Sequence, residues 1–525
     1  MNRFGLLHLL TALITYGQVD VMTGNYNNAR TSANLAETAL STASVSPDGF
    51  GKLATFPVLG QVYAQPLVVT GLNVPACGTC DVVFVATMEN NVYAFNATTL
   101  DPTPLWSVNL GPSVPTQLVN FYAVDPSLGI LGTPTISSGR QAIYLVAETL
   151  RGGQPVFQLH ALELETGNEI LNGPVDITAS AAGSGDASVD GIVSLDPMQH
   201  IQRPALLASN GMLYAAFGSV YDRDPYHGWV LAYDENNIQS QTALFNSTPN
   251  GGRGGIWQSG RGLVADDSGE IYLGTGNGDY DGLNNFGETF LHVSPQLQVV
   301  DWFTPADWQA RSDVDLDTAS LGPILIPSID MIFGGDKDNN GYLIDRWNMG
   351  HLGISGASVP QIFQPIGFGG LFNVAVWDRT DGPLVYFVEE GTATSGWRIS
   401  NRAFETAPFS TTDLTSDYPW QGIAISASGD ADGTGILWLT AGDHTQDDVP
   451  GTVYAFNAQD LTQVLWTSEI NPDRDRLGEF AKFATPTVAN GLVFVPTFSN
   501  QVVVYGLLNS TGTTGQARSN KRKLY

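Results

Sequence analysis

Short segments in which apolar and polar residues alternate recur along most of the chain. Turns rich in glycine, proline, asparagine and aspartate separate these segments. Alternation with a period of two is typical of a β-strand that has one face in a core. The clearest examples are residues 82–87, 142–147, 212–216, 271–274 and 436–440. The pattern predicts an all-β protein.

The strands belong to a degenerate repeat. Val-Tyr-Ala-Phe-Asn-Ala at residues 92–97, followed by Leu105-Trp106, returns at residues 453–458, followed by Leu465-Trp466. A spacing of roughly 50–70 residues is within or above the range expected for propeller blades. Trp106 and Trp466 are then expected to pack between blades. The repeats predict eight blades, which start near residues 62, 132, 203, 258, 321, 372, 422 and 484.

One strand at each end of the repeat region lacks a partner. The last blade ends at residues 502–507 without its outer strand, and residues 51–58 form an outer strand without a blade. Pairing residues 51–58 with residues 500–507 would close the ring and cover the last sheet edge. We therefore expect a single eight-bladed β-propeller over residues 50–508, closed by an N-terminal strand and preceded by an N-terminal segment, residues 18–49.

The two ends of the chain differ from the repeat region. An apolar run inside residues 1–17 predicts a signal peptide, and residues 509–525 predict a flexible C-terminal tail. The protein is therefore expected to be secreted and extracellular, or periplasmic in a bacterium, with no membrane span. Cys77 and Cys80 are expected to form a disulfide in such a compartment. Three glycosylation sequons, at Asn96, Asn246 and Asn509, would make it a glycoprotein in a eukaryotic host.

The overall charge narrows the choice of partners. Charged residues make up only 14% of the 525 residues, and the formal net charge is −29. Such an acidic surface repels the phosphate backbone, so a nucleic acid is excluded as a partner. Divalent and trivalent cations are attracted instead.

Three segments in the middle of the chain resemble the active-site wall of the quinoprotein alcohol dehydrogenases, and the repeat resembles theirs over residues 50–508. The segments are Gly-Gly-Ile-Trp-Gln-Ser at residues 254–259, Ile-Tyr-Leu-Gly-Thr-Gly-Asn at 271–277 and Asp-Val-Asp-Leu-Asp at 313–317, and Lys337 follows. The resemblance implies pyrroloquinoline quinone as cofactor, with Ca²⁺ or a lanthanide.

The resemblance also implies a role for each residue. Trp257 would lie beneath the quinone, and Lys337 would contact the quinone oxygens. Asn277 would bind the metal, Asp315 would bind it and act as the catalytic base, and Asp317 would be the extra aspartate of lanthanide-dependent members. Oxygen ligands of this kind suit hard cations.

Other positions depart from the family pattern. Arg223 stands where the family has a glutamate ligand, so Asp222 or Asp224 would have to take its place. Val314 replaces the usual tryptophan, the chain has no adjacent cysteine pair, and no arginine for the quinone carboxylates is evident.

Three functions remain open. The first is a secreted oxidoreductase that acts on a small-molecule alcohol or sugar. The second is a non-catalytic propeller that has lost the cofactor and binds a protein partner. The third is a propeller hydrolase or lyase that uses two carboxylates. Its candidate residues are Asp222, Asp224, Asp279, Asp315 and Asp317.

Overall fold

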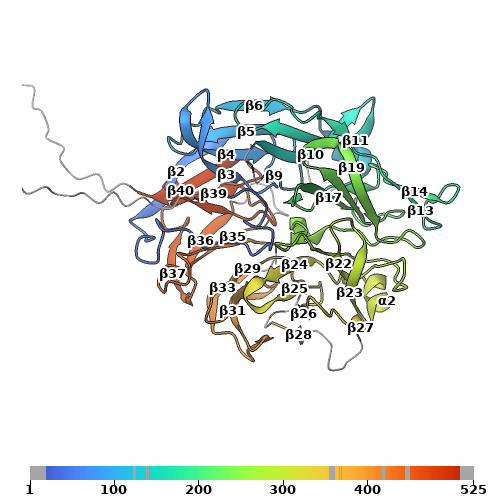
Figure 1. Cartoon of the computed structure of the whole chain (residues 1–525). Helices are drawn as coiled ribbons and strands as arrows, with labels where there is room; N and C mark the ends of the chain where they lie inside the picture. The colour runs from blue at the N-terminus through green and yellow to red at the C-terminus, as the bar shows by residue number, and fades with distance from the viewer. Residues whose placement is uncertain are drawn as a thin grey trace, which may run out of the picture.

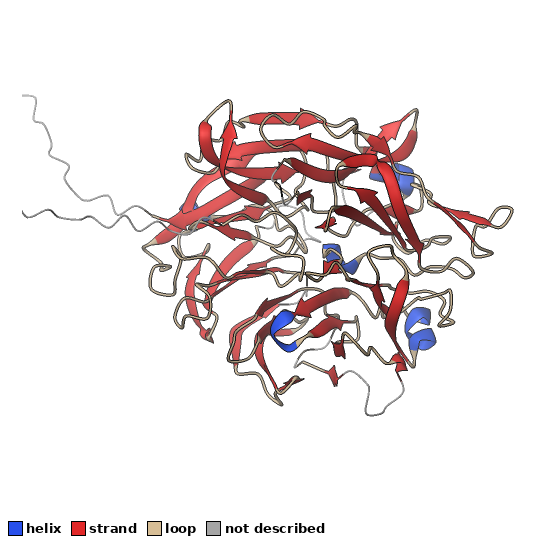
Figure 2. Ribbon diagram, in the orientation of Figure 1, coloured by secondary structure: helices blue, strands red, loops and turns tan. Residues whose placement is uncertain are grey.

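Eight antiparallel sheets surround a common axis. The computed structural model describes residues 19–121, 126–137, 139, 141–353, 361–365, 367, 369–416, 420–443 and 450–508. In Figure 1 the colour runs once around the ring, from the blue first blade to the red last blade. Strands and turns make up almost all of it (Figure 2). The prediction of an all-β, eight-bladed propeller is confirmed.

Each blade has four main strands, of which the first in sequence lies nearest the axis, except that β2 supplies the outermost strand of the last blade. The first blade consists of β3 (Leu67–Val74), β4 (Gly78–Ala86), β5 (Asn91–Asn96) and β6 (Trp106–Asn109), and the second of β9 (Thr135–Ile136), β10 (Ala142–Arg151), β11 (Gln154–Glu163) and β12 (Val175–Asp176). The third consists of β16 (Leu207–Ser209), β17 (Met212–Ser219), β18 (Trp229–Asp234) and β19 (Asn237–Asn246). The fourth consists of β20 (Val264–Ala265), β21 (Ile271–Gly274), β22 (Phe290–Val293) and β23 (Val299–Pro305). The fifth blade consists of β24 (Leu321–Ile326), β25 (Met331–Gly335), β26 (Gly341–Asp345) and β28 (Gln361–Phe363), and the sixth of β29 (Val374–Trp377), β30 (Leu384–Phe387), β31 (Thr392–Ser400) and β33 (Ser410–Ser416). The seventh consists of β34 (Gly422–Ser426), β35 (Ile436–Ala441), β36 (Thr452–Asn457) and β37 (Asp460–Thr467). The eighth consists of β38 (Thr487–Ala489), β39 (Leu492–Pro496), β40 (Gln501–Leu507) and β2 (Phe50–Pro57).

The second strands of the blades are buried more completely than alternation predicts. All four residues of β21 are buried, and so are five of the six residues of β35. Both faces of a blade are covered, because each blade packs between two neighbours. The repeated tryptophans take part in this packing. Trp466 is fully buried, and the indole N–H of Trp106 donates to the Leu164 carbonyl of the next blade (2.9 Å).

The ring closes between the two ends of the repeat region, as predicted. β2 pairs antiparallel with β40, from Phe50 opposite Leu507 to Pro57 opposite Gln501. The blue β2 accordingly lies beside the red β40 in Figure 1. The Phe50 ring is buried against Trp438 and Trp466, with centroid distances of 5.4 and 5.0 Å.

The N-terminal segment makes a second closure, near the axis. Residues 21–34 visit the innermost strand of the eight blades in order, and β1 (Ala33–Asn34) pairs parallel with β34. We call residues 21–34 the axial belt. Val21 pairs with Val68 of the first blade, and the side-chain amides of Asn28 and Asn34 donate to the carbonyls of Ala208 in the third blade and Val488 in the eighth. The other five blades donate a backbone N–H to a belt carbonyl: Ile136 to Met22, Ala265 to Asn28, Leu325 to Ala29, Val376 to Thr31 and Ile425 to Ser32.

A buried arginine anchors the belt. The Arg30 guanidinium donates to the carbonyls of Gly24, Leu206 and Leu263 at 2.7–3.0 Å, and to the Thr23 hydroxyl. Every one of these acceptors is neutral. The charge is therefore offset by oriented dipoles, and the belt is tied directly to the loops that lead into β16 and β20.

Several features outside the ring were also predicted. Cys77 and Cys80 form a disulfide at the β3–β4 turn, as expected. The sequon asparagines Asn96 and Asn246 are both buried, so the folded chain does not expose these two amides for glycosylation. The predicted signal peptide, the C-terminal tail and Asn509 lie outside the part of the chain that the structure describes. Within that part, no helix is long and apolar enough to span a membrane.

The packing of Phe50 predicts how strongly the outer closure stabilises the fold. Phe50→Ala removes a buried ring from between two tryptophans and should lower the free energy of unfolding by about 3–5 kcal/mol. Leu59→Ala is the control, because Leu59 is 63% exposed beside the same strand. Chemical denaturation checks both variants. Equal stability of the two would show that β2 contributes little to closure.

Candidate functional site

Loops from three consecutive blades bring the candidate residues to one face of the ring. Strands within a blade are antiparallel, so a loop after a second strand and a loop before the next first strand share a face. Asp222, Asn277 and Lys337 follow the second strands β17, β21 and β25. Trp257 precedes β20 and the two aspartates, Asp315 and Asp317, precede β24.

Lys337 is the centre of this cluster. Its ammonium lies 2.7 Å from Asp315 Oδ1 and 2.7 Å from Asp317 Oδ2. Asp317 is almost fully buried, whereas the side chain of Asp315 is 60% exposed. Although burial lowers the pKa of Lys337, the charges of Asp317 and Asp315 outweigh burial and raise it above its ordinary value. One cation therefore holds two carboxylates together at the mouth of the site.

Trp257 forms one wall of the cluster. Its indole N–H donates to Asp317 Oδ2 (3.0 Å), and its ring lies 5.5 Å from the Lys337 ammonium. The ring of Phe372 packs against it at a centroid distance of 6.0 Å. The indole is thus fixed by a hydrogen bond, a cation–π contact and a ring contact.

Asn277 donates hydrogen bonds to both aspartates, Asp315 and Asp317. Its backbone N–H donates to Asp317 Oδ1 (2.9 Å), and its side-chain amide donates to Asp315 Oδ1 (2.7 Å). The remaining atom, Oδ1 of Asn277, is buried without a hydrogen-bond partner. The preceding Gly276 is required by the close approach, because a Cβ there would lie 2.3 Å from Asp317 Oδ1.

Asp222 and Asp224, the two alternatives for the missing glutamate, have different surroundings. Asp222 accepts hydrogen bonds from the hydroxyls of Ser219 (2.7 Å) and Tyr226 (3.1 Å). Burial raises the pKa of Asp222, and the negative charge of Asp317 raises it further. Asp224 instead forms a two-pronged ion pair with Arg253 at 2.7 and 2.9 Å. The structure therefore places Asp222 near the cluster and commits Asp224 to a surface pair.

A further acid was missed by the sequence analysis. Glu288 is fully buried next to β22, its Oε2 accepts the backbone N–H of Thr318 (2.6 Å), and its Oε1 has no partner. Burial, together with the charge of Asp317, raises the pKa of Glu288 to about 8. No motif surrounds Glu288 in the sequence, so only its burial marks it.

The acidic turn that contains Lys337, residues 336–341, has a structural role. Asp336 is buried and accepts from Arg311 Nη1 (2.5 Å), the Tyr342 hydroxyl (2.5 Å) and the Asn340 side chain (2.9 Å). Its oxygens are therefore used within the protein. This turn fixes the backbone from which Lys337 extends.

The donor set suits a hard cation. Asn277 Oδ1 is an unsatisfied buried oxygen, other atoms of Asn277 donate to the carboxylates of Asp315 and Asp317, and both carboxylates act electrostatically on Asp222. Burying an oxygen without a partner is costly, and a coordinated cation would satisfy it. Among the residues with described positions, no group of three His, Cys, Asp or Glu side chains is placed to hold a metal ion. A cation bound here would need the amide oxygen as well as the carboxylates.

The comparisons with known proteins support the fold. No family model matches the chain, and no curated protein sequence does. The structure is similar to that reported for quinohemoprotein alcohol dehydrogenase ADHIIG from Pseudomonas putida HK5. The TM-score is 0.59 at 14% identity, over 93% of this chain and 80% of that one. At this identity the likeness shows a shared fold, and it confirms the predicted quinoprotein-like architecture.

Two other propellers show weaker likeness. One is the Dos1 propeller, with a TM-score of 0.47 at 11% identity over 87% of this chain and 95% of that one. The other is the Myceliophthora thermophila Cps50 (Swd1) propeller domain, with a TM-score of 0.42 at 9% identity over 87% of this chain and all of that one. We draw no argument from them.

The buried acid predicts a pH dependence of stability. Folded Glu288 keeps its proton up to about pH 8, whereas the unfolded chain loses it near the ordinary value of 4.5. Wild-type stability should therefore fall as pH rises between these values. Glu288→Gln keeps an acceptor for Thr318 and should unfold with a free energy on the order of 3 kcal/mol above wild type at pH 9, with little difference at pH 4.5. Urea denaturation of EDTA-treated protein at both pH values tests this. A constant difference across the range would contradict the assignment.

Proposed function

We propose that the chain is an oxidoreductase of the quinoprotein type, which oxidises an alcohol or sugar hydroxyl and uses pyrroloquinoline quinone with a hard cation. The observation that carries the proposal is the convergence of Trp257, Asn277, Asp315, Asp317 and Lys337 into one bonded network. They come from separate loops spread over 81 positions, and a shared network is not required by the fold alone.

The network has a part for each requirement of such a reaction. Asn277 Oδ1, Asp315 and Asp317 would hold the cation, and Asp222 is placed to contribute. The exposed Asp315 carboxylate is the group that can reach a substrate hydroxyl and take its proton. The Trp257 ring offers a flat surface to an aromatic cofactor. The Lys337 ammonium would stabilise negative charge beside that surface.

The cofactor would supply the redox chemistry. When bound, the quinone accepts two electrons, while the cation polarises its carbonyl. The protein's own part is to orient the reactants and to hold the proton on Asp315. Asp317 is more buried and fully hydrogen-bonded, so its part is to position Lys337, Trp257 and Asn277.

Cation binding is the first test of the proposal. Wild-type protein freed of metal should release or absorb heat when titrated with La³⁺ or Ca²⁺, and with quinone present it should reduce a dye in the presence of an alcohol. Asp315→Ala should abolish dye reduction and weaken cation binding at least about tenfold, because it removes a ligand and the base. Asp224→Ala is the matched control. It removes an aspartate of the same region that is paired with Arg253, and it should leave both properties unchanged.

Results with the wild type separate the three functions. A flat calorimetric trace with both metals and added quinone would overturn the oxidoreductase and favour the scaffold. Hydrolysis or elimination of a glycoside without quinone would favour the hydrolase or lyase. Loss of cation binding in Asp224→Ala would show that Asp224 leaves Arg253 to serve as a ligand.

A second variant tests the charge of the site. Asp317→Asn keeps the size of the side chain and one acceptor oxygen but lowers the negative charge by one, so it should weaken La³⁺ binding more than Ca²⁺ binding. The ratio of the two dissociation constants, from calorimetry, is the measurement. The Asp315→Asn variant provides a comparison at an exposed carboxylate. An unchanged ratio in Asp317→Asn would exclude Asp317 from the cation's surroundings.

A further inference from the structure

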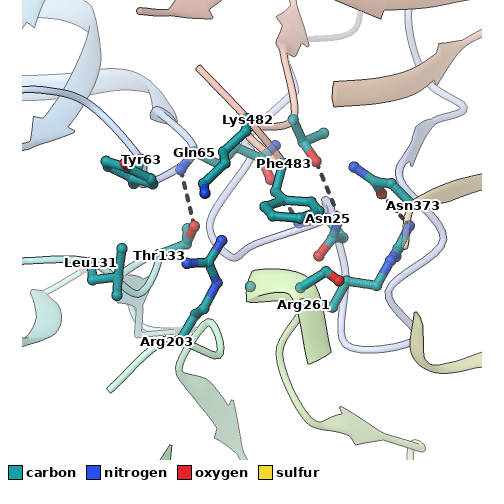
Figure 3. A pocket seen from close by; sticks show the side chains of 13 residues that line it. Asn25, Tyr63, Gln65, Leu131, Thr133, Arg203, Arg261, Asn373, Lys482 and Phe483 are labelled. Carbon is teal, nitrogen blue, oxygen red and sulfur yellow. Dashed lines mark hydrogen bonds between the residues drawn. The ribbon is translucent and has the colours of Figure 1, made fainter. Parts of the chain in front are cut away.

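Deeper along the axis lies a cavity whose charge is opposite to that of the protein. It is bounded by the axial belt at Asn25 and by the inner loops of several blades (Figure 3). We call it the axial cation cavity. It encloses about 440 Å³ of empty space, its mouth included, and most of this space is too narrow for anything larger than waters or a compact ion. Its lining residues are Asn25, Tyr63, Gln65, Leu131, Thr133, Arg203, Ser259, Gly260, Arg261, Asn373, Lys482, Phe483 and Thr485.

Two buried cations point into this cavity. Arg203 and Lys482 are only 8% and 9% exposed, and Figure 3 shows their charged ends directed toward one another. Neither makes a hydrogen bond or an ion pair with any residue that the structure describes, and Arg203 Nε is buried without an acceptor. None of the described lining residues is an aspartate or a glutamate. This is unusual in a chain with a net charge of −29.

Aromatic rings offset only part of this charge. The Arg203 guanidinium lies 5.1 Å from the Phe483 ring centroid, and the Lys482 ammonium lies 6.0 Å from that of Trp420. Such contacts do not replace the hydrogen bonds that water gives to a guanidinium or an ammonium. Burial, and the charge of Arg203, lower the pKa of Lys482 to about 7. The two groups therefore repel each other unless an anion lies between them.

A neutral donor completes the arrangement. The Gln65 side chain accepts the Asn25 backbone N–H through Oε1 (2.7 Å), which leaves its Nε2 donor buried without a partner. Its backbone N–H donates to the Thr133 hydroxyl (2.9 Å), which fixes Gln65 at the cavity wall. Arg203 Nε and Gln65 Nε2 are thus buried donors without partners in the wall of one cavity. The Lys482 ammonium lies in the same wall and donates to no residue that the structure describes.

We propose that the axial cation cavity binds a compact oxyanion, such as phosphate, sulfate or a small dicarboxylate, between Arg203 and Lys482. Charge-assisted hydrogen bonds from the two cations and the amide would satisfy all three groups. The cavity is distinct from the Trp257 cluster, because Trp257, Asp317 and Lys337 are not among its lining residues. The Phe372 ring contacts both Trp257 and Phe483, the latter 5.8 Å away in the cavity wall. The inference therefore does not rest on the proposed oxidation reaction.

Ligand-induced stabilisation is the main test. Full-length protein is titrated with phosphate, sulfate and oxalate, each against sodium chloride at matched ionic strength, by calorimetry and thermal melting. At least one of these anions should bind and raise the melting temperature in a saturable way, by on the order of 1–3 °C. Binding of phosphate and sulfate but not oxalate would identify an inorganic anion as the occupant, and the reverse would identify a carboxylate.

Variants locate the site. Lys482→Met and Arg203→Met each remove a buried unpaired charge, so both should fold with an unchanged or raised melting temperature in anion-free buffer. Each should weaken binding at least about tenfold, which corresponds to the loss of one charge-assisted contact. Arg402→Gln is the control, because Arg402 is an exposed cation paired with Asp345, and it should bind like wild type.

The pH dependence distinguishes a binding site from nonspecific attraction. Sulfate does not titrate near neutrality, so its affinity reports on the protein. The other titratable residues that line the cavity are Tyr63, Arg203 and Arg261. Wild type should bind sulfate more tightly at pH 6 than at pH 8.5, because Lys482 is then protonated, and Lys482→Met should lose this difference. The proposal is wrong if no oxyanion binds better than chloride, or if binding survives in both variants.

Discussion

The whole architecture depends on closing a ring of sheets that otherwise would end in two open edges. An open β-edge exposes unpaired N–H and carbonyl groups and an apolar blade face. This chain closes the ring at two radii with the same N-terminal stretch. β2 completes the outer side of the last blade, and the axial belt bonds to the innermost strand of each blade in turn. Fourteen residues are enough for the axial belt to reach all eight blades, because its residues follow one another in the same order as the blades.

Double closure explains how loops from separate blades can hold a charged cluster. Four acidic residues are close enough to affect one another's pKa or to share a partner: Asp222, Asp315, Asp317 and Glu288. Ionised carboxylates repel one another in a partly buried site. The Lys337 ammonium opposes the three aspartates, and the Arg311 guanidinium acts on Glu288. With Glu288 protonated at neutral pH, the three aspartates still outnumber the Lys337 ammonium, so this part of the cluster carries a net negative charge. This excess is what makes a cation the natural complement.

The sequence was sufficient for those features that repeat or that form a recognisable order. The blade starts followed from the recurring strand and Leu-Trp pattern, and the closure followed from two unpaired strands. The convergence of Trp257, Asn277, Asp315, Asp317 and Lys337 followed from their resemblance to a known order of motifs. Alternation was less reliable. Both faces of a blade are covered by neighbours, so β21 and β35 are buried on each side.

Other features depend on contacts that no local pattern records. The axial belt is held largely by backbone hydrogen bonds to distant strands, which any sequence could make, so residues 18–49 could only be described as a segment. Glu288 is distinguished by burial, and Asp224 is separated from Asp222 by its pairing with Arg253. Arg203 and Lys482 are 279 positions apart and meet only because the third and eighth blades face the same axis.

The structure thus has two charged clusters of opposite sign, the carboxylates around Lys337 and the cations of the axial cation cavity, and we propose a ligand for each. The Phe372 ring contacts both Trp257 of the outer cluster and Phe483 of the inner cavity. Unlike charges attract, and more strongly in a medium of low dielectric constant than in water. Filling either site changes the field at the other. A cation at the outer carboxylates disfavours the protonated form of Lys482, and an anion beside Lys482 opposes the gathering of negative charge near Asp317. Each ligand would also neutralise the protein groups of its own site, which would weaken the attraction between the two sets of protein groups. The two bound ligands, however, would attract one another, because their charges are opposite. The sign of the coupling between the two ligands would therefore follow from how completely each ligand neutralises its site.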